Sequence, residues 1–320
     1  MHSADEQVLG RLCEWLAADT PAWLATIVAT YGSSPRPVGS LFACNARGET
    51  AGSLSGGCIE EDLIEKLTST PADNGGVQLL EYGVSAEENE RLGLPCGGKL
   101  EVLLEYLEKQ DLAHVSELSA AVRERRYLCR EVDVDGGDRS LTPVERYAAP
   151  EFTGQRLRQV FGPRYRMLLI GAGQLSQTLS ELAVAMDYQV FVNDPRRELL
   201  AQWGGAEVQL IDGMPDDAVR QYAADRDSIV LTLTHDPRID DMALMEALQH
   251  EHFYVGALGS ARTSAARRKR LLQLDISEAQ LDKLHAPVGL DIGSKTPMEI
   301  AISILAQLTQ LRVSRVREAA

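Results

Sequence analysis

The chain has 320 residues, a length that predicts about two domains of roughly 100 to 200 residues each. Hydrophobic residues make up 44% and charged residues 25% of the chain, proportions that exclude a largely disordered or fibrous protein. The 47 Asp and Glu residues outnumber the 32 Lys and Arg residues and give a net charge of −15. This charge repels nucleic acid and anionic membrane surfaces, so we expect neither as a partner.

The cysteines and the first segment of the chain predict a cytoplasmic protein. Residues 1–20 are acidic and amphipathic, without the basic and apolar regions of a signal peptide. No apolar run approaches the roughly 18 residues that a membrane span needs. The cysteines form no CxxC pair, which is unlike a disulfide framework or a zinc ribbon and favours a reducing compartment. They are Cys13, Cys44, Cys58, Cys96 and Cys129.

The first half of the chain predicts a smaller α+β domain over residues 1–150. Apolar residues at helical spacing predict a helix near its start, and alternation or β-rich composition predicts strands. A further helix and a short strand pair follow, to which we assign no chemistry beyond scaffold. In chain order these elements are expected over residues 9–18, 23–30, 99–106 and 111–146.

Three glycine-rich stretches interrupt this domain, over residues 32–40, 52–60 and 93–98. The second stretch opens a predicted helix, because the apolar residues that follow it recur at helical spacing. Cys58 is therefore expected near the N-terminus of that helix. Cys96 lies in the third stretch, where we expect a turn before the strand over residues 99–106.

The surroundings of Cys58 and Cys96 favour two different interpretations. The helix dipole beside Cys58 and the charge of Lys99 near Cys96 both favour a thiolate, which is a soft metal ligand or sulfur acceptor. Glu60 and Glu61 oppose this effect at Cys58, so the direction of its pKa stays open. A single cysteine is also commonly an inert small hydrophobe.

The second half, residues 151–320, predicts a Rossmann-like doubly wound parallel sheet. Short apolar strands alternate with helical segments, as in sheets that carry helices on both faces. Asp236 before Pro237 and Thr296 before Pro297 predict helix starts, and Thr296 with Glu299 completes a capping box. The strands are expected over residues 167–170, 189–193, 208–211, 228–233, 254–257 and 287–290.

The turn after the first of these strands predicts a nucleotide site. Gly171, Gly173 and Gln174 lie in a Gly-x-Gly-x-x-Ser sequence that leads from a strand into a helix, where a phosphate can approach the helix N-terminus. Asp194, just past the second strand, stands where an acidic side chain accepts hydrogen bonds from a ribose. Ser176 replaces the usual third glycine or alanine and weakens the assignment to a dinucleotide.

Three candidate residues follow later strands at the same rim. His235 is the nearest proton-transfer group for a nicotinamide reaction, or it hydrogen-bonds its own loop. Gly259 lies in a rim turn, and Lys295 brings a positive charge to the start of the final helix, which suits an anion or belongs to a capped helix. The basic residues over 262–270 predict an anion or partner patch, or a solvated helix face.

These motifs together resemble the XdhC/CoxI family of molybdenum-enzyme accessory proteins. In the first half the resemblance rests on GSSPRPVG from Gly32, GSLSGGCIE from Gly52 and PCGGKLEVLLE from Pro95. In the second half it rests on the glycine turn at Gly171 and on the sequences NDPR, THD and GALGS, whose order and spacing are those of the family's Rossmann domain. The resemblance covers most of the chain except residues 111–158.

The resemblance implies a chaperone, with no catalytic residue assigned. Such a chaperone binds molybdenum cofactor, protects it while a cysteine desulfurase installs its sulfido ligand, and delivers it to an apo molybdenum hydroxylase such as xanthine dehydrogenase, aldehyde oxidoreductase or carbon monoxide dehydrogenase. The cargo is molybdopterin or its cytosine dinucleotide form. A cysteine at position 58 favours the dinucleotide form. A cofactor cytidylyltransferase is a further expected partner, and we expect a homodimer.

The residues and the resemblance combine into one hypothesis with two ends. The first half is expected to hold the molybdenum end through Cys58 or Cys96, and the rim of the second half is expected to receive a phosphate, a nucleotide or NAD. Two alternatives stay open: a nicotinamide-dependent oxidoreductase and a non-catalytic interaction scaffold. The expected cofactor-binding residues are Arg36, Gly56, Gly57, Cys58, Cys96, Gly97, Gly98, Gly171, Gly173, Gln174, Asp194, His235, Gly259 and Lys295.

Overall fold

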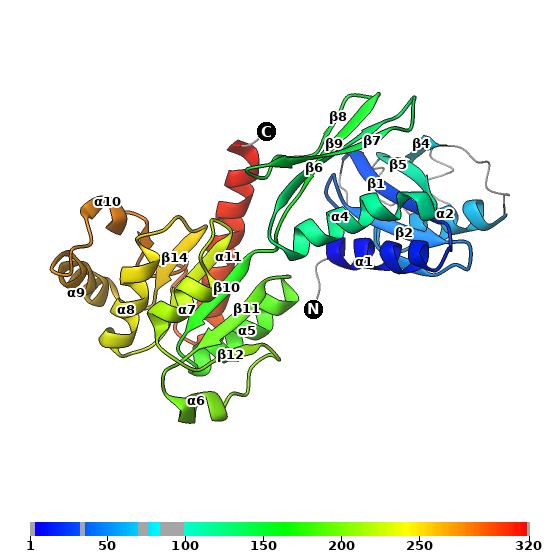
Figure 1. Cartoon of the computed structure of the whole chain (residues 1–320). Coiled ribbons are helices and arrows are strands. Elements are labelled where there is room, and N and C mark those ends of the chain that lie inside the picture. The colour runs from blue at the N-terminus through cyan, green and yellow to red at the C-terminus, as the bar shows by residue number, and fades with distance from the viewer. Residues whose placement is uncertain (1–3, 33–35, 70–75, 84–98, 319–320) are drawn as a thin grey trace. The chain divides into compact units, whose positions relative to one another are not determined.

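The computed structural model describes residues 4–32, 36–69, 76–83 and 99–318, and the chain divides into two units, His2–Pro163 and Arg164–Arg315 (Figure 1). The boundary lies beyond the predicted residue 150. The reason is that β8 (Glu151–Phe152) and β9 (Arg156–Phe161) pair with each other, and β9 pairs with a strand of the first unit. None of the helices in the described part of the chain has the length and apolarity to cross a membrane.

The first unit is built on an antiparallel sheet of five strands in the order β3-β2-β1-β5-β4. Helix α1 packs on this sheet because its apolar residues recur at helical spacing and are buried, among them Val8, Leu12 and Trp15. The predicted helix and strands are confirmed, with slightly wider bounds. The elements are α1 (Ala4–Ala17), β1 (Ala22–Tyr31), β2 (Leu41–Asn45), β3 (Thr50–Gly52), α2 (Cys58–Ser69), β4 (Val77–Tyr82) and β5 (Lys99–Leu107).

The register of this sheet brings to one end of it the described residues that flank the glycine-rich stretches. Tyr31 at the end of β1 pairs with Lys99 at the start of β5, and Gly52 at the end of β3 pairs with Phe42 near the start of β2. Tyr82 at the end of β4 pairs with Leu100. We call this end, marked by these residues, the glycine end. Every described chain segment that flanks a glycine-rich stretch therefore meets the sheet there.

A second sheet, in the order β7-β6-β9-β8, completes the first unit. It is tied to β5 by the buried carboxylate of Glu105, which accepts hydrogen bonds from Arg130 at 2.6 and 2.9 Å and from Arg139 at 2.8 Å. Removing one partner of such a buried pair typically costs about 3–5 kcal/mol. The remaining elements are η1 (Lys109–Asp111), α4 (Leu112–Arg123), β6 (Tyr127–Asp133) and β7 (Arg139–Val144), as the predicted helix and strand pair required.

The second unit contains a six-stranded parallel sheet in the order β12-β11-β10-β13-β14-β15. Numbered within the unit this is 3-2-1-4-5-6, the strand order of the Rossmann fold. The predicted fold class is confirmed. The strands are β10 (Arg166–Ile170), β11 (Gln189–Asn193), β12 (Gln209–Ile211), β13 (Ser228–Thr232), β14 (Tyr254–Ala257) and β15 (Leu284–His285).

Helices cover both faces of this sheet because successive strand residues point to opposite sides. On β10, Met167 and Leu169 pack with α5 and α11, whereas Leu168 and Ile170 pack with α7 and α8. The sixth strand was predicted over residues 287–290 but ends before Pro287, which has no N–H to donate to a strand. The helices are α5 (Gln174–Ala185), α6 (Arg197–Ala201), α7 (Pro215–Tyr222), α8 (Pro237–Ala247), α9 (Ala261–Leu272), α10 (Glu278–Leu281) and α11 (Pro297–Glu318).

Candidate functional site

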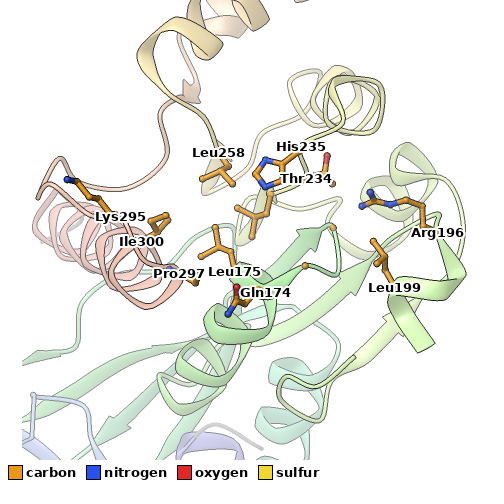
Figure 2. Close-up of a pocket in the computed structure, with 13 residues that line it drawn as sticks. Gln174, Leu175, Arg196, Leu199, Thr234, His235, Leu258, Lys295, Pro297 and Ile300 are labelled. Atoms are coloured by element: carbon orange, nitrogen blue, oxygen red, sulfur yellow. The ribbon is translucent and has the colours of Figure 1, made fainter. Parts of the chain in front are cut away.

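A pocket of about 330 Å³ lies in the second unit at the carboxyl ends of its strands (Figure 2). It spans the position between β10 and β13 where the strand order changes direction, which is where open parallel sheets bind ligands. Its volume lies at the low end of the range for ligand pockets. The structure brings five of the predicted residues into its wall: Gly171, Gly173, Gln174, His235 and Lys295.

The glycine turn forms the floor of the pocket. Gly171 has a φ of +109°, and a Cβ added there would lie 2.7 Å from the methyl carbon of Thr234, so only glycine fits. Gly173 precedes α5 and faces open space. The first amide groups of a helix have no acceptor within it, and within the described residues the amides of Gly173, Gln174 and Leu175 make no hydrogen bond. The start of α5 thus offers free donors to the pocket.

Asp194 does not line the pocket, contrary to the sequence-based expectation that it faces a ribose. Its carboxylate is fully buried and accepts hydrogen bonds from the Ala172 amide at 2.9 Å and from the Arg196 backbone and guanidinium at 2.8–3.0 Å. Burial would raise the pKa of Asp194, but these hydrogen bonds hold it below its usual range. All four acceptor positions of the carboxylate are filled by the protein.

Arg196 occupies the pocket wall where the acidic residue was expected. Two of its nitrogens, Nε and Nη2, are held by Asp194 at 2.8 Å, and its side chain is 38% exposed. In the sequence Arg196 stood out only as part of the NDPR motif and was not a candidate site residue. The sequence offered one signal for its role: Arg196 follows the candidate acid Asp194 by two residues, close enough for the two side chains to pair.

The loop that carries His235 is fixed by a buried ion pair. The Thr234 hydroxyl donates to Asp240 at 2.7 Å, and Asp240 pairs with Arg267 at 3.1 Å. Arg267 also donates to the carbonyl oxygen of Leu258, at 3.1 Å. Two walls of the pocket, the one after β13 and the one after β14, are therefore held by one charge pair, while His235 itself stays exposed.

Of the two remaining predicted rim residues, Lys295 lines the pocket and Gly259 does not. The exposed Lys295 lines the pocket through its side chain, but its amide and that of Thr296 donate to Glu299, at 2.8 and 2.9 Å. The predicted capping box of α11 is therefore present. These two amides donate to a glutamate of the helix itself and are not free for a ligand. Gly259 lies next to the lining residue Leu258 but does not line the pocket.

The basic run over residues 262–270 does not form the open patch that one interpretation expected. Arg267 is buried against Asp240, Arg268 pairs with Glu278 and Asp282, and Arg270 pairs with Asp241. Three of its five positive charges are thus neutralised by acidic residues. They hold α8, α9 and α10 together.

At the glycine end of the first unit, the turn before α2 closes on a carboxylate of its own helix. Glu60 accepts hydrogen bonds from the amides of Leu54, Ser55, Gly56 and Gly57 at 2.8–3.1 Å. The hydroxyl groups of Ser53 and Ser55 donate to the same carboxylate. We call this arrangement the Glu60 loop. Gly56 and Gly57 have positive φ angles, and no atom lies within 4 Å of a Cβ added at either.

Glu60 is ionised within this loop. Burial would raise the pKa of its carboxyl, but the hydrogen bonds from the side chain and backbone of Ser55 and from the side chain of Ser53 lower it well below the ordinary value. Cys58 is the first residue of α2, as predicted. The negative charge of Glu60 therefore lies in the first turn of the helix that Cys58 begins, where it offsets the positive end of the helix dipole.

The other predicted residues of the first unit are only partly tested. Arg36 is exposed in the stretch between β1 and β2. The side chain of Cys58 and the whole of Cys96, Gly97 and Gly98 lie outside the described residues, so their roles stay predictions. Within the described part, no three His, Cys, Asp or Glu side chains come together as ligands of a metal ion.

Comparison with known families assigns both units. A model described as the XdhC Rossmann domain matches residues 167–308, and the model of the XdhC and CoxI family matches residues 15–83. The chain belongs to the XdhC and CoxI family. The family predicted from the glycine-rich stretches is thereby confirmed.

Relatives of this XdhC/CoxI protein extend over nearly its whole length. It is 26% identical over 306 residues to the molybdenum cofactor insertion chaperone PaoD of Escherichia coli, covering 94% of this chain and 86% of PaoD. It is 26% identical over 316 residues to a probable xanthine dehydrogenase subunit of Bacillus subtilis, covering 91% and 93%. A crystal structure described as a xanthine dehydrogenase from Bacillus halodurans has a TM-score of 0.77 and 27% identity, covering 100% and 98%.

Proposed function

We propose that this chain is a molybdenum cofactor-binding chaperone that supports sulfuration of the cofactor and inserts it into a molybdenum hydroxylase. The observation that carries the proposal is its similarity, over 94% of its length, to a molybdenum cofactor insertion chaperone. That length is greater than either unit alone, so the similarity includes residues of both units. Each offers chemistry that one end of such a cargo needs.

The glycine end is proposed to receive the molybdenum end of the cargo. Cys58 begins α2 there, and Cys96 shortly precedes the start of β5 at Lys99. A thiolate from either cysteine is a soft ligand for molybdenum. Because the amides of Gly56 and Gly57 are held by Glu60, these glycines contribute open space rather than donors. Arg36, Gly97 and Gly98 complete the proposed set.

The pocket of the second unit is proposed to receive the phosphate or nucleotide end. Its support is the open start of α5 beside Arg196 and Lys295, since anions bind at helix N-termini and beside arginine. Either molybdopterin or its cytosine dinucleotide form meets this requirement. The nicotinamide-dependent oxidoreductase is less well supported, because the acidic residue that would bind the ribose, Asp194, is saturated by protein donors.

The proposed role requires three kinds of partner protein. The chaperone receives cofactor that a cysteine desulfurase sulfurates, and it delivers the cofactor to an apo molybdenum hydroxylase. For a cytosine dinucleotide cargo, a cofactor cytidylyltransferase supplies it. The chaperone acts as a homodimer in this proposal. Binding must be reversible, because delivery depends on a higher affinity of the client for the same cargo.

Anaerobic titration with molybdenum cofactor tests this proposal. Bound molybdenum and pterin per chain are measured for the wild type, Cys58→Ser, Cys96→Ser and the control Cys13→Ser, whose cysteine lies in α1. We expect stoichiometric binding by the wild type and the control, and loss of molybdenum in a variant of Cys58 or Cys96. Absence of binding by the wild type in either cofactor form contradicts the chaperone. Full retention in both variants contradicts the role of the cysteines.

A further inference from the structure

The pocket of the second unit carries positive charge at both of its ends and apolar side chains between them. Figure 2 shows Arg196 and Lys295 on opposite sides, with Leu175 and Ile300 between them. Among the described residues, no acidic side chain lines the pocket. A ligand that fits this distribution has an apolar ring for the middle and an anionic group for at least one end.

The two ends differ in how firmly the cation is held. Lys295 is an exposed, flexible side chain. Arg196 is fixed, because Asp194 binds its Nε and Nη2 atoms and is itself buried and bonded to Ala172 of the glycine turn. The third nitrogen, Nη1, has no hydrogen-bond partner among the described residues. Arg196 is therefore preorganised to donate to an anion.

The guanidinium of Arg196 and the start of α5 line the same pocket and are linked through Asp194. Asp194 joins the guanidinium to the Ala172 amide, so the guanidinium lies beside the turn from which α5 starts. The amides of Gly173, Gln174 and Leu175 are free there within the described part of the chain. An added Cβ at Gly173 would meet no atom within 4 Å, so an anion can approach the turn closely.

We propose that this pocket binds a phosphorylated ring compound of mononucleotide size, with its phosphate held by the start of α5 and Nη1 of Arg196. Arg196 makes the pocket select for a phosphate and against an unphosphorylated ribose. In Rossmann sites that bind a ribose, an acidic residue at this position accepts from the ribose hydroxyl, and here that carboxylate is already filled. A phosphate needs donors, which the position supplies.

The size of the pocket favours one ring system over two. Its volume of about 330 Å³ lies at the bottom of the range for ligand sites. Only the part of a dinucleotide nearest its phosphates would therefore be enclosed. The apolar surfaces of Leu175, Leu199 and Ile300 suit a flat heterocycle.

This inference deepens the proposed function, since a phosphorylated pterin or its nucleotide is such a compound. The selectivity for phosphate, however, stands without the chaperone, because it follows from Arg196 and α5 alone. Simple probes therefore separate the two. Binding of a nucleoside monophosphate without binding of molybdenum cofactor would support the pocket and contradict the chaperone.

Calorimetric titration of the full chain with cytidine 5′-monophosphate, cytidine and NAD⁺ tests the inference. We expect the monophosphate to bind and cytidine to bind at least about 10-fold more weakly, because the nucleoside lacks the charge-assisted hydrogen bonds. Arg196→Gln is expected to weaken monophosphate binding by about 10- to 100-fold. The matched control Arg197→Gln removes the neighbouring charge, which is 84% exposed and paired with Asp212, and should leave binding unchanged.

A second variant guards against misfolding. Arg196→Gln leaves the buried Asp194 unpaired, so the double variant Asp194→Asn with Arg196→Gln removes both charges and should show the same loss of binding. Equal binding of cytidine and the monophosphate overturns the inference, as does an equal loss in Arg197→Gln. Failure of the monophosphate to bind, or tighter binding of NAD⁺ that survives Arg196→Gln, also overturns it.

Discussion

The two units each place a glycine-rich turn before a helix, but one turn is closed and the other is open. Before α2, four amides and two hydroxyls converge on Glu60. Before α5, the carboxylate of Asp194 takes only the Ala172 amide from the turn, and it turns Arg196 toward the pocket. The donors of the closed turn are thus taken up by Glu60, whereas the amides of Gly173, Gln174 and Leu175 in the open turn stay free within the described residues.

The difference follows from where the nearest acidic residue lies along the helix. Glu60 is the third residue of α2 and Glu299 the third of α11, positions from which a glutamate reaches back to the amides before the helix. Helix α5 has no acidic residue in its first turn. A glycine-rich turn before a helix is therefore an anion site only where the helix does not supply its own anion.

Replacing Glu60 by alanine should break the closed turn with the largest effect. Glu60→Ala leaves several amide and hydroxyl donors without an acceptor, so we expect the first unit to lose about 3 kcal/mol of stability. Hydrogen exchange of the amides in α1 and β1 measures this loss. Glu61→Ala, which changes the exposed neighbour, should alter stability by less than about 0.5 kcal/mol. Equal effects of the two variants would contradict the role of Glu60.

The two glycines of the open turn should separate stability from binding. Gly171→Ala forces a side chain into a positive φ beside Thr234 and should cost about 2 kcal/mol in unfolding experiments. Gly173→Ala has room and a φ of −81°, so we expect a change below about 0.5 kcal/mol. The added methyl group would, however, take up space that we propose for the phosphate. Unimpaired binding of cytidine 5′-monophosphate to Gly173→Ala would place the phosphate elsewhere.

A conservative change at Asp194 distinguishes two roles of this residue. Asp194→Asn keeps the shape but weakens the hold on Arg196, so we expect about 10-fold weaker binding of the monophosphate. Calorimetric titration measures it. If Asp194 instead bound a ribose, the variant would reduce the affinity for cytidine and NAD⁺ and leave inorganic phosphate binding unchanged.

Acid should reduce the contribution of the closed turn to stability. The pKa of Glu60 is lower in the folded chain than the ordinary value of 4.5, so its contribution to stability is present above pH 4.5 and is lost as the pH falls below it. The stability difference between the wild type and Glu60→Gln should shrink there by up to about 1.4 kcal/mol per pH unit. Urea unfolding at pH 7, 4.5 and 3.5 measures it, and a difference independent of pH would contradict an ionised Glu60.

Most of the fold was predictable because its signals are local. The parallel strands were visible as short apolar runs between helical segments, and Thr296 with Glu299 marked the start of α11. The end of the first unit was not predictable, because β9 joins it by pairing with the distant β6. The sixth strand was predicted at the wrong residues. The prediction followed the apolar composition of residues 287–290 and gave too little weight to Pro287, which has no N–H for a strand hydrogen bond.

The sequence predicted which residues meet at the pocket, but it did not predict what each side chain contacts there. Gly171, Gly173, Gln174, His235 and Lys295 meet because strand ends of a parallel sheet meet. That Asp194 would turn inward to Ala172 and present Arg196 depends on contacts across two strands, which spacing does not show. The closure by Glu60 was not predicted either, although a glutamate three residues after Gly57 was the signal that the sequence offered.

Delivery of cofactor tests the central claim most directly. The chain is loaded anaerobically with sulfurated molybdenum cofactor and mixed with an apo molybdenum hydroxylase in the presence of excess protein-free cofactor of distinguishable molybdenum isotope. We predict that the client becomes active and contains the isotope carried by the chain. Incorporation of both isotopes in proportion to their concentrations would show that the chain delivers nothing and would contradict the account.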